Sequence, residues 1–368
     1  MKKLIERIGI DRLVISCFRI MRINFEKLKT RRNVVVEYQE QAGYLLADGA
    51  CFSRLKIEDN VQFGTLTAGI KKTRYGEQDY AFMDITIGDA ETGNLQNTTI
   101  QEYKERVVRI FGYLKETYGM EIEKEETRIS KMEINTTFHL DKPFYQYHRA
   151  LRLMMFNLPD YYKKISEVKK KNKQYMRLES ETFYRGNKSM QIKIYDKKRQ
   201  IEYKTGTKLE AELMRIEFVL LTAQKVRESF GTNQLWDITD EQIDKYYITQ
   251  FRKLFERRYD LWKVDNQKRL RSMVIAHKKE NRNMWQRNLL NECRNLEQNN
   301  QVPFLLDIQD LLEQVQVLEK KGHFSRIKKG ILQKCEPEDV YLREDAKKIE
   351  EIFDKVNRLY ESNTKQES

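Results

Sequence analysis

The chain has 368 residues, of which 40% are apolar and 34% are charged, and its formal net charge is +13. This length allows one large domain or two medium domains, each with its own core. An aromatic content of 11% excludes a disordered chain. The basic excess indicates a polyanionic partner, although solubility alone would also explain it.

The sequence has no feature of a membrane or secreted protein. No stretch approaches the roughly 18 consecutive apolar residues of a membrane span. The first residues, Met1 to Arg7, carry charge where a secretory signal needs an apolar run. The four cysteines have no paired spacing, so neither a disulfide framework nor a zinc cluster is indicated. We expect a soluble, cytoplasmic protein that does not contact a membrane.

The first part of the chain is predicted to mix strands and helices. Alternating or β-branched runs indicate the strands, and apolar residues at helical spacing indicate the helices. The expected strands cover residues 11–16, 33–38, 80–87, 128–138, 190–197 and 212–221. The expected helices cover residues 99–118, capped by Thr99 and ended by Gly119, and residues 143–158, stopped by Pro159.

From residue 239 the pattern is nearly all helical. Two apolar stripes recur at helical spacing, which is typical of helix-bundle cores. They are Ile243, Tyr247, Phe251, Leu254, Phe255 and Trp262, and then Leu305, Ile308, Leu311, Leu312, Val315 and Leu318. We therefore place a domain boundary near residue 231, between a mixed region (1–231) and a helical region (232–368).

Two basic segments are candidates for contact with a phosphate backbone. The first, residues 161–177, has a single acid, Glu167, and includes Lys169, Lys170, Lys171 and Lys173. The second lies on the exposed side of the first helical stripe and includes Arg252, Lys253, Arg257 and Arg258. A solvated surface explains the first charge run equally well, so both interpretations stay open.

One tyrosine stands out on the strand that begins at Met190. Alternation places Gln191, Lys193, Tyr195 and Lys197 on one face and the apolar residues on the other. A phenol beside ammonium groups is suited to attack on phosphate, because its ordinary pKa near 10 must be offset electrostatically. The alternative is that Tyr195 is an ordinary strand residue, since tyrosine favours strands.

Two carboxylates are expected on neighbouring apolar strands. Glu133 alternates with the apolar residues of strand 128–138, and Glu217 has apolar neighbours on strand 212–221. A buried carboxylate is costly unless it is paired or binds a metal. Mg²⁺ or Mn²⁺ would suit oxygen ligands, but an ion pair with Arg215 explains Glu217 as well. No Walker-type loop, dinucleotide fingerprint or serine-hydrolase elbow is present.

The order of four segments resembles that of a known protein family. Ile10–Ser16, Lys131–Asn135, Lys193–Lys197 and Arg215–Phe218 follow one another as in rolling-circle replication initiators of plasmids and phages and in the related relaxases of conjugative elements. The resemblance covers residues 8–232. It implies an α+β fold with a largely antiparallel central sheet, flanking helices and an all-helical C-terminal region.

The resemblance also implies a reaction and a set of site residues. Tyr195 would attack one phosphodiester of origin DNA, leaving a 5′-phosphotyrosine and a free 3′-OH, and would later rejoin the strand. Tyr184 is the main rival for this role. Lys193 and Lys197 would stabilise phosphate charge, and the divalent ion would bind Glu133, Glu217 and, more weakly indicated, Asp84.

The resemblance also implies binding partners. They are duplex and single-stranded origin DNA, a host helicase and polymerase, and a second copy in a homodimer. The His-hydrophobe-His metal motif of many such enzymes is absent, which fits the subgroup that uses carboxylates. Two alternatives stay open: a relaxase of an integrative or conjugative element, and an origin-binding regulator without enzymatic activity.

Overall fold

The structure is a computed structural model that describes most of the chain. The described residues are 6–16, 18–37, 44–45, 51–52, 54–60, 62–73, 76–87, 97–164, 182–280, 283–298, 308–335 and 342–366. Internal contacts divide the chain into two compact units. The sheet unit comprises residues 1–140, 161–248 and 359–368, and the helical unit comprises residues 141–160 and 249–358.

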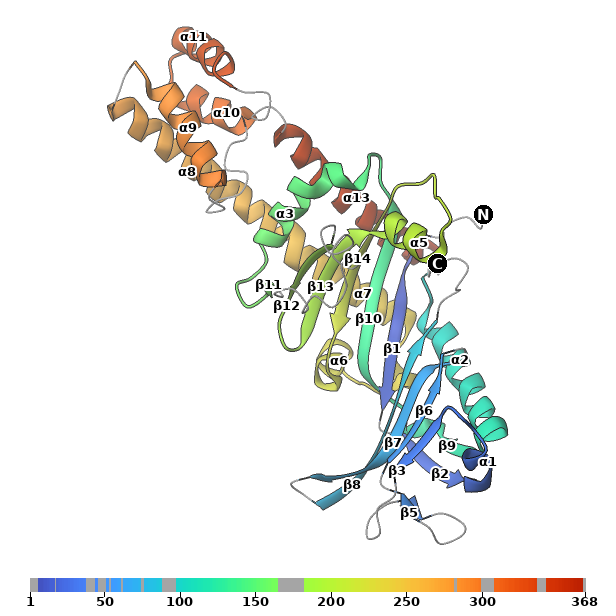
Figure 1. Cartoon of the computed structure of the whole chain (residues 1–368). Coiled ribbons are helices and arrows are strands. Elements are labelled where there is room, and N and C mark those ends of the chain that lie inside the picture. The colour runs from blue at the N-terminus through green and yellow to red at the C-terminus, as the bar shows by residue number, and fades with distance from the viewer. Residues whose placement is uncertain are drawn as a thin grey trace. The chain divides into compact units, whose positions relative to one another are not determined.

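The sheet unit is built on a ten-stranded sheet in which every neighbouring pair is antiparallel (Figure 1). The strand order is β11-β12-β13-β14-β10-β1-β8-β7-β6-β3. In that order the strands are Lys163–Lys164, Thr182–Gly186, Met190–Asp196, Leu213–Leu220, Arg128–His139, Ile8–Ser16, Gly76–Thr86, Gly64–Thr73, Arg54–Asp59 and Val34–Glu37. The expected largely antiparallel sheet with helices is confirmed, while the specific initiator-like fold stays a prediction.

Short elements complete the β-structure of this unit. β2 (Arg19–Ile23) pairs with β9 (Met120–Glu123), and β4 (Tyr44–Leu45) pairs with β5 (Cys51–Phe52). The helix α1 (Phe25–Lys29) follows β2 and is capped by Asn24.

The apolar face of the sheet carries the core. On β14, Met214, Ile216 and Phe218 alternate with Arg215 and Glu217, so the two sets point to opposite faces. The apolar set packs against α7 (Asp240–Phe251). The hydroxyl of Tyr247 donates to the carbonyl of Ile216 at 3.2 Å, and its ring lies 5.0 Å from that of Phe218. The opposite face keeps the polar side chains.

The helix after β8 begins and ends as its sequence predicts. α2 (Ile100–Tyr113) starts with a capping box in which Thr99 and Glu102 exchange hydrogen bonds. A π-helical turn, Leu114–Tyr118, continues it to Gly119, whose φ of 69° is in the left-handed region. The carbonyl of Gly119 accepts a 2.8 Å bond from the amide of Asn24, so this helix end is joined to the start of α1.

Gly119→Ala is expected to destabilise the protein by about 3 kcal/mol. Left-handed backbone costs a non-glycine residue about 1–2 kcal/mol, and the added Cβ would overlap Cβ of Asn24. Gly206 is the matched control, because its φ is 71° and a Cβ there meets nothing within 4 Å. Gly206→Ala should cost only about 1 kcal/mol. Urea unfolding of both variants measures the difference, and equal losses would contradict the close approach at Asn24.

The remaining helices of the sheet unit follow strands. α5 (Lys197–Thr205) leaves β13 and is capped by Asp196, and α6 (Ala223–Phe230) leaves β14 and is capped by Thr222. The sheet unit extends past the boundary expected near residue 231, because α7 packs on the sheet through Tyr247. A functional division at residue 231 stays a prediction.

The helical unit consists of packed helices and one short segment from the middle of the sequence. Its main helices are α3 (His148–Phe156), α8 (Arg257–Glu280), α9 (Trp285–Gln298), α10 (Ile308–Leu318), α11 (Lys321–Leu332) and most of α13 (Leu342–Gln366). Residues 143–158 begin as a 3₁₀ turn, Phe144–Tyr147, before α3, and the Tyr147 hydroxyl donates to Glu351 at 2.7 Å. That contact explains why residues 141–160 group with helices far along the chain.

The expected apolar stripes are buried for the most part. Phe251, Leu254 and Phe255 of the first stripe and Leu311 and Val315 of the second are at most 1% exposed. Trp262 is only half-buried, and Leu305 lies outside the described residues. None of the described helices is long and apolar enough to cross a membrane.

Candidate active site on the polar sheet face

The polar side chains of four adjacent strands lie in cross-strand rows. Strand register places Tyr184 of β12 opposite Lys193, Lys193 opposite Glu217, and Glu217 opposite Asn135 of β10. Paired residues of antiparallel strands project to the same face with Cβ atoms about 5 Å apart. The expected polar face of β13 therefore meets the polar faces of β14 and β10. We call the polar side chains on these faces the polar cluster; they are Tyr184, Lys193, Tyr195, Glu133, Asn135, Arg215 and Glu217.

Glu217 lies at the centre of the polar cluster. It is 2% exposed, accepts a 2.5 Å bond from the Tyr195 hydroxyl on Oε1, and accepts a 3.1 Å bond from Lys193 Nζ on Oε2. Burial alone would raise the pKa of Glu217, but the charges of Lys193 and Arg215 outweigh it and hold that pKa below its usual value. Glu217 is therefore a carboxylate at neutral pH.

Tyr195 is enclosed rather than presented to solvent. Tyr195 is 8% exposed, and its hydroxyl donates a hydrogen bond to Glu217. Burial, followed by the negative charge of Glu217, raises the pKa of Tyr195 well above 10. Sequence analysis expected neighbouring lysines to offset the tyrosine pKa, but in this geometry burial and Glu217 outweigh them. Tyr195 is a neutral hydrogen-bond donor.

Arg215 supplies a buried positive charge beside Glu217. It is wholly buried, and its Nε donates to Thr137 at 2.7 Å while Nη2 lies 3.3 Å from Asn97 Oδ1. Its Nη1 is 3.3 Å from the Asp11 carboxylate. The guanidinium charge lowers the pKa of Glu217. This coupling is what the alternative to a metal site, a structural ion pair between Arg215 and Glu217, predicts.

Lys197 lies inside the fold at the start of α5. It is 1% exposed, and its Nζ donates to Gln200 at 2.8 Å. Burial, followed by repulsion from Arg215, lowers the pKa of Lys197 well below its usual value. Its assignment as a group that stabilises phosphate charge stays a prediction, and in this arrangement Lys197 is not a solvent-facing cation.

The proposed metal ligands are each held by a basic side chain. Glu133 accepts from Lys131 at 2.7 Å on Oε1, and its Oε2 is 3.6 Å from Lys193 Nζ. Lys193 thus lies between the two carboxylates of Glu133 and Glu217, which raise its pKa against the effect of burial. A divalent ion bound by both Glu133 and Glu217 would have to displace the Lys193 ammonium.

Asp84 is engaged elsewhere on the sheet. It forms a two-point ion pair with Arg12, in which the Nε–Oδ1 distance is 2.8 Å. Within the described part of the chain, no group of three His, Cys, Asp or Glu side chains is placed to hold an ion. The donor set as arranged does not fit Mg²⁺ or Mn²⁺, so the metal requirement stays a prediction that depends on displacement of Lys193.

Asn135 is a further polar residue of this face, and sequence analysis assigned it no role. It is fully buried, and neither its Oδ1 nor its Nδ2 has a hydrogen-bond partner among the described residues. Buried polar groups nearly always have a partner, so an orphaned carboxamide beside Glu217 marks a place where a ligand or water would bind. The signal was its alternation with Glu133 on an apolar strand.

Tyr184 is the accessible tyrosine of the polar cluster. It is half-buried, its hydroxyl donates to Gln191 at 2.6 Å, and it lies opposite Lys193. Burial raises the pKa of Tyr184, while the positive charge of Lys193 lowers it in part. Glu133 and Glu217 raise it further, so the pKa of Tyr184 is above its ordinary value even though Lys193 lies opposite.

The expected DNA-binding residues divide between described and undescribed parts. Lys169, Lys170, Lys171 and Lys173 lie outside the described residues. In the helical unit, Lys253, Arg257 and Arg258 are exposed, whereas Arg252 bonds Asn357 Oδ1 through Nε at 2.9 Å and through Nη2 at 2.7 Å. Their role in DNA binding stays a prediction.

Comparison with known proteins identifies no relative. No family model matches the chain, and no curated protein matches it at a significant level. The resemblance to rolling-circle initiators therefore rests on the order of four short segments alone.

The buried tyrosines and Glu217 together predict how stability depends on pH. The folded state raises the pKa of Tyr195, Tyr246 and Tyr247, that of Tyr246 to about 12, so stability should fall as pH rises above about 10, where the unfolded chain ionises. The folded state lowers the pKa of Glu217, so its contribution is present above about pH 4.5 and is lost as pH falls through the lowered value. Urea midpoints and phenolate absorbance measured against pH test this, and full tyrosine ionisation near pH 10 without loss of stability would contradict it.

Proposed function

We propose that this chain cuts one strand of DNA and rejoins it through a tyrosine on the polar cluster. One observation carries the proposal: a half-buried tyrosine, Tyr184, lies directly opposite Lys193, which is itself held by two carboxylates. A phenol beside a fixed cation is suited to attack on a phosphodiester, because the cation partly offsets the phenol pKa and can stabilise charge on the phosphate. The net charge of +13 is compatible with a polyanionic partner.

The reaction would proceed by transfer of one phosphodiester to the protein. The Tyr184 oxygen attacks phosphorus and gives up its proton to water, the bond from phosphorus to the 3′ oxygen breaks, and that oxygen takes a proton from water. The products are a 5′-phosphotyrosine and a free 3′-OH. Attack of the 3′-OH on the phosphotyrosine reverses each bond change and reseals the strand.

The other cluster residues would support this step from the sheet. Lys193 would stabilise negative charge on the attacked phosphate, and Glu217 and Glu133 would fix the position of Lys193. Tyr195 would hold Glu217 through its 2.5 Å hydrogen bond. The assignment of the attack to Tyr195 itself stays a prediction, because its access to a phosphate is less favourable than that of Tyr184.

The test is formation of a covalent adduct between the protein and DNA. The purified chain is incubated with supercoiled DNA from its own replicon, with Mg²⁺, with Mn²⁺ and with chelator. We expect relaxed DNA and a protein-linked 5′ end on denaturing gels. Failure to form any adduct under all three conditions would contradict the proposal, and adduct in chelator would show that no ion is needed.

A second candidate function is DNA binding without cleavage. It is favoured by the interactions within the polar cluster. Tyr195 and Lys193 both donate hydrogen bonds to Glu217, and the charge of Arg215 stabilises its carboxylate form. Such a regulator would bind origin DNA with no adduct and would tolerate loss of either tyrosine hydroxyl. A replication initiator and a relaxase would use the same chemistry, so this site does not distinguish them. The replicon and the host helicase and polymerase would. A homodimer stays a prediction.

A further inference from the structure

The helical unit contains one helix whose charge is entirely basic. α11 and its two flanks, residues 320–334, contain six lysines and arginines and no acid. These are Lys320, Lys321, Arg326, Lys328, Lys329 and Lys334, and all six are exposed. Among the described residues, none of the four within α11 has an ion-pair partner. A high density of unpaired cations on one element is the electrostatic footprint of phosphate binding.

The cations of α11 lie on its solvent face. The helix buries Ile331 and half-buries Phe324 and Ile327, which recur at helical spacing and define its packed side. At 100° per residue, Lys321, Lys328, Lys329 and Arg326 fall on the remaining side. Exposed Gly322 and Ser325 lie among them, together with Leu332, which is 45% exposed. The solvent face of α11 is therefore an open basic surface.

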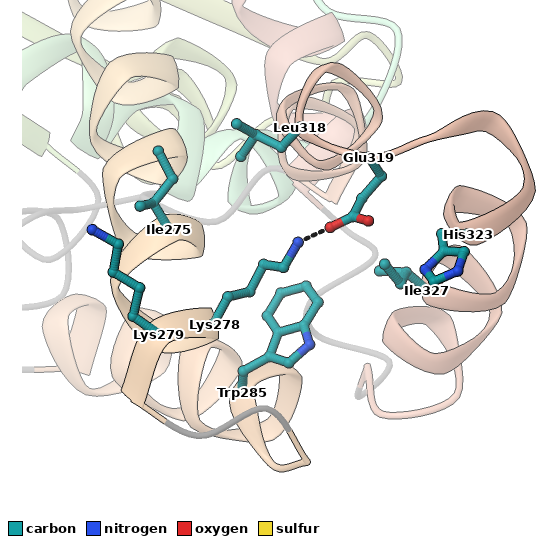
Figure 2. A pocket seen from close by; sticks show the side chains of 8 residues that line it. All are labelled: Ile275, Lys278, Lys279, Trp285, Leu318, Glu319, His323 and Ile327. Atoms are coloured by element: carbon teal, nitrogen blue, oxygen red, sulfur yellow. Dashed lines mark ion pairs between the residues drawn. The ribbon is translucent and has the colours of Figure 1, made fainter.

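The packed side of α11 is fixed firmly enough to present that surface. α10 ends at Leu318 and α11 begins at Lys321, so only Glu319 and Lys320 join them. Glu319 forms an ion pair with Lys278 of α8, and Lys278 Nζ lies 5.8 Å from the ring centre of Trp285 (Figure 2). A short, anchored turn between two helices restricts the direction of the second helix.

A second contact holds the other end of α11. Gly330 lies so close to α9 that a Cβ there would come within 2.8 Å of the Gln286 side chain. Lys334 Nζ donates to the same Gln286 Oε1 at 2.8 Å. Around the first end lies a hollow of about 700 Å³ (Figure 2). Its lining includes the two lysines Lys278 and Lys279 and the one acid Glu319, which is paired with Lys278. Lys279 of α8 adds one exposed positive charge beside α11 at this end.

We propose that α11 is the element by which the helical unit binds duplex DNA, through the phosphate backbone. The choice of DNA as the polyanion rests on the proposed function, whereas the choice of α11 rests on its charge and anchoring. It differs from the set Arg252, Lys253, Arg257 and Arg258. Acids such as Glu256 and Asp260 interrupt that set, and Arg252 already bonds Asn357. The two surfaces can be compared at equal charge.

The experiment compares two variants of the full chain, each of which loses four positive charges. One carries K321Q, R326Q, K328Q and K329Q, and the other carries R252Q, K253Q, R257Q and R258Q. Binding of a fluorescent 20-base-pair duplex is followed by anisotropy between 50 and 200 mM salt. We expect the α11 variant to lose at least about tenfold in affinity. The slope of log K against log salt should fall by about 0.9 for each phosphate that the variant no longer neutralises.

Each outcome bears on the proposal. A larger loss in the second variant, or equal losses in both, would overturn the assignment to α11, as would absence of duplex binding by the unchanged protein. Circular dichroism and the urea midpoint confirm that both variants fold. Adduct formation on a short single-stranded oligonucleotide should survive in the α11 variant. If the unchanged protein binds duplex through α11 but forms no adduct, the strand-transfer proposal fails alone.

Discussion

Tyr184→Phe is expected to reduce the covalent DNA adduct by more than about 10³-fold, because no other group replaces an attacking nucleophile. Phenylalanine keeps the ring on β12 and removes only the hydroxyl that donates to Gln191. The fold should therefore persist, with a urea midpoint close to that of the unchanged protein. The measurement is the yield of protein-linked 5′ end after a fixed time on a denaturing gel. Tyr203→Phe is the matched control, since Tyr203 is 56% exposed on α5 and lies in no proposed site.

Tyr195→Phe should give a different result. Removal of its hydroxyl leaves Glu217 Oε1 without its 2.5 Å donor in a buried place, which costs about 1–3 kcal/mol of stability. The adduct should still form, at a lower yield because Glu217 and Lys193 are less well fixed. Loss of the adduct in Tyr195→Phe with full yield in Tyr184→Phe would return the attack to Tyr195. Full yield in both would exclude a tyrosine nucleophile on this face.

Local sequence pattern was sufficient to predict three of the four strands that form this site, those of Glu133, Tyr195 and Glu217, but not β12, which carries Tyr184. The alternation around Tyr195 assigned that residue to a polar strand face, and Glu217 was predicted to be a carboxylate among apolar neighbours. Strand register shows that Lys193, from the polar face of β13, lies opposite Glu217. Side-chain alternation is a property of a single strand, so a single sequence reveals it. The same holds for the helix between Thr99 and Gly119, whose capping box and left-handed glycine are local signals.

The pairing of strands far apart in the sequence was not predictable in the same way. Nothing within either strand indicates that Lys193 lies opposite Glu217, 24 residues later, or that Glu133 shares the same ammonium. These contacts decide whether the carboxylates are free to bind an ion. Asp84 of β8 illustrates the same limit, because it is paired with Arg12 of the neighbouring strand β1. Burial of Tyr195 likewise depends on the whole fold and not on its strand.

Glu217→Gln is expected to cost about 3–5 kcal/mol of unfolding free energy, the usual effect of removing one partner from a buried ion pair. Glutamine has nearly the same shape, so the loss measures charge. Without the carboxylate, the buried guanidinium of Arg215 and the ammonium of Lys193 lose the negative charge that lies between them. Urea unfolding at neutral pH measures the loss, with and without Mn²⁺.

Glu133→Gln is the matched control for charge, and it should cost only about 1 kcal/mol. Its partner Lys131 is partly exposed and can be hydrated, and Lys193 keeps Glu217. Similar losses in the two variants would contradict the central position of Glu217. If Mn²⁺ instead stabilises the unchanged protein and neither variant, both carboxylates bind the ion, and Lys193 must then leave its place between them. Lys193→Met separates these cases further, because it removes the ammonium that Glu133 and Glu217 share. Its stability should therefore rise with added Mn²⁺ even if that of the unchanged protein does not.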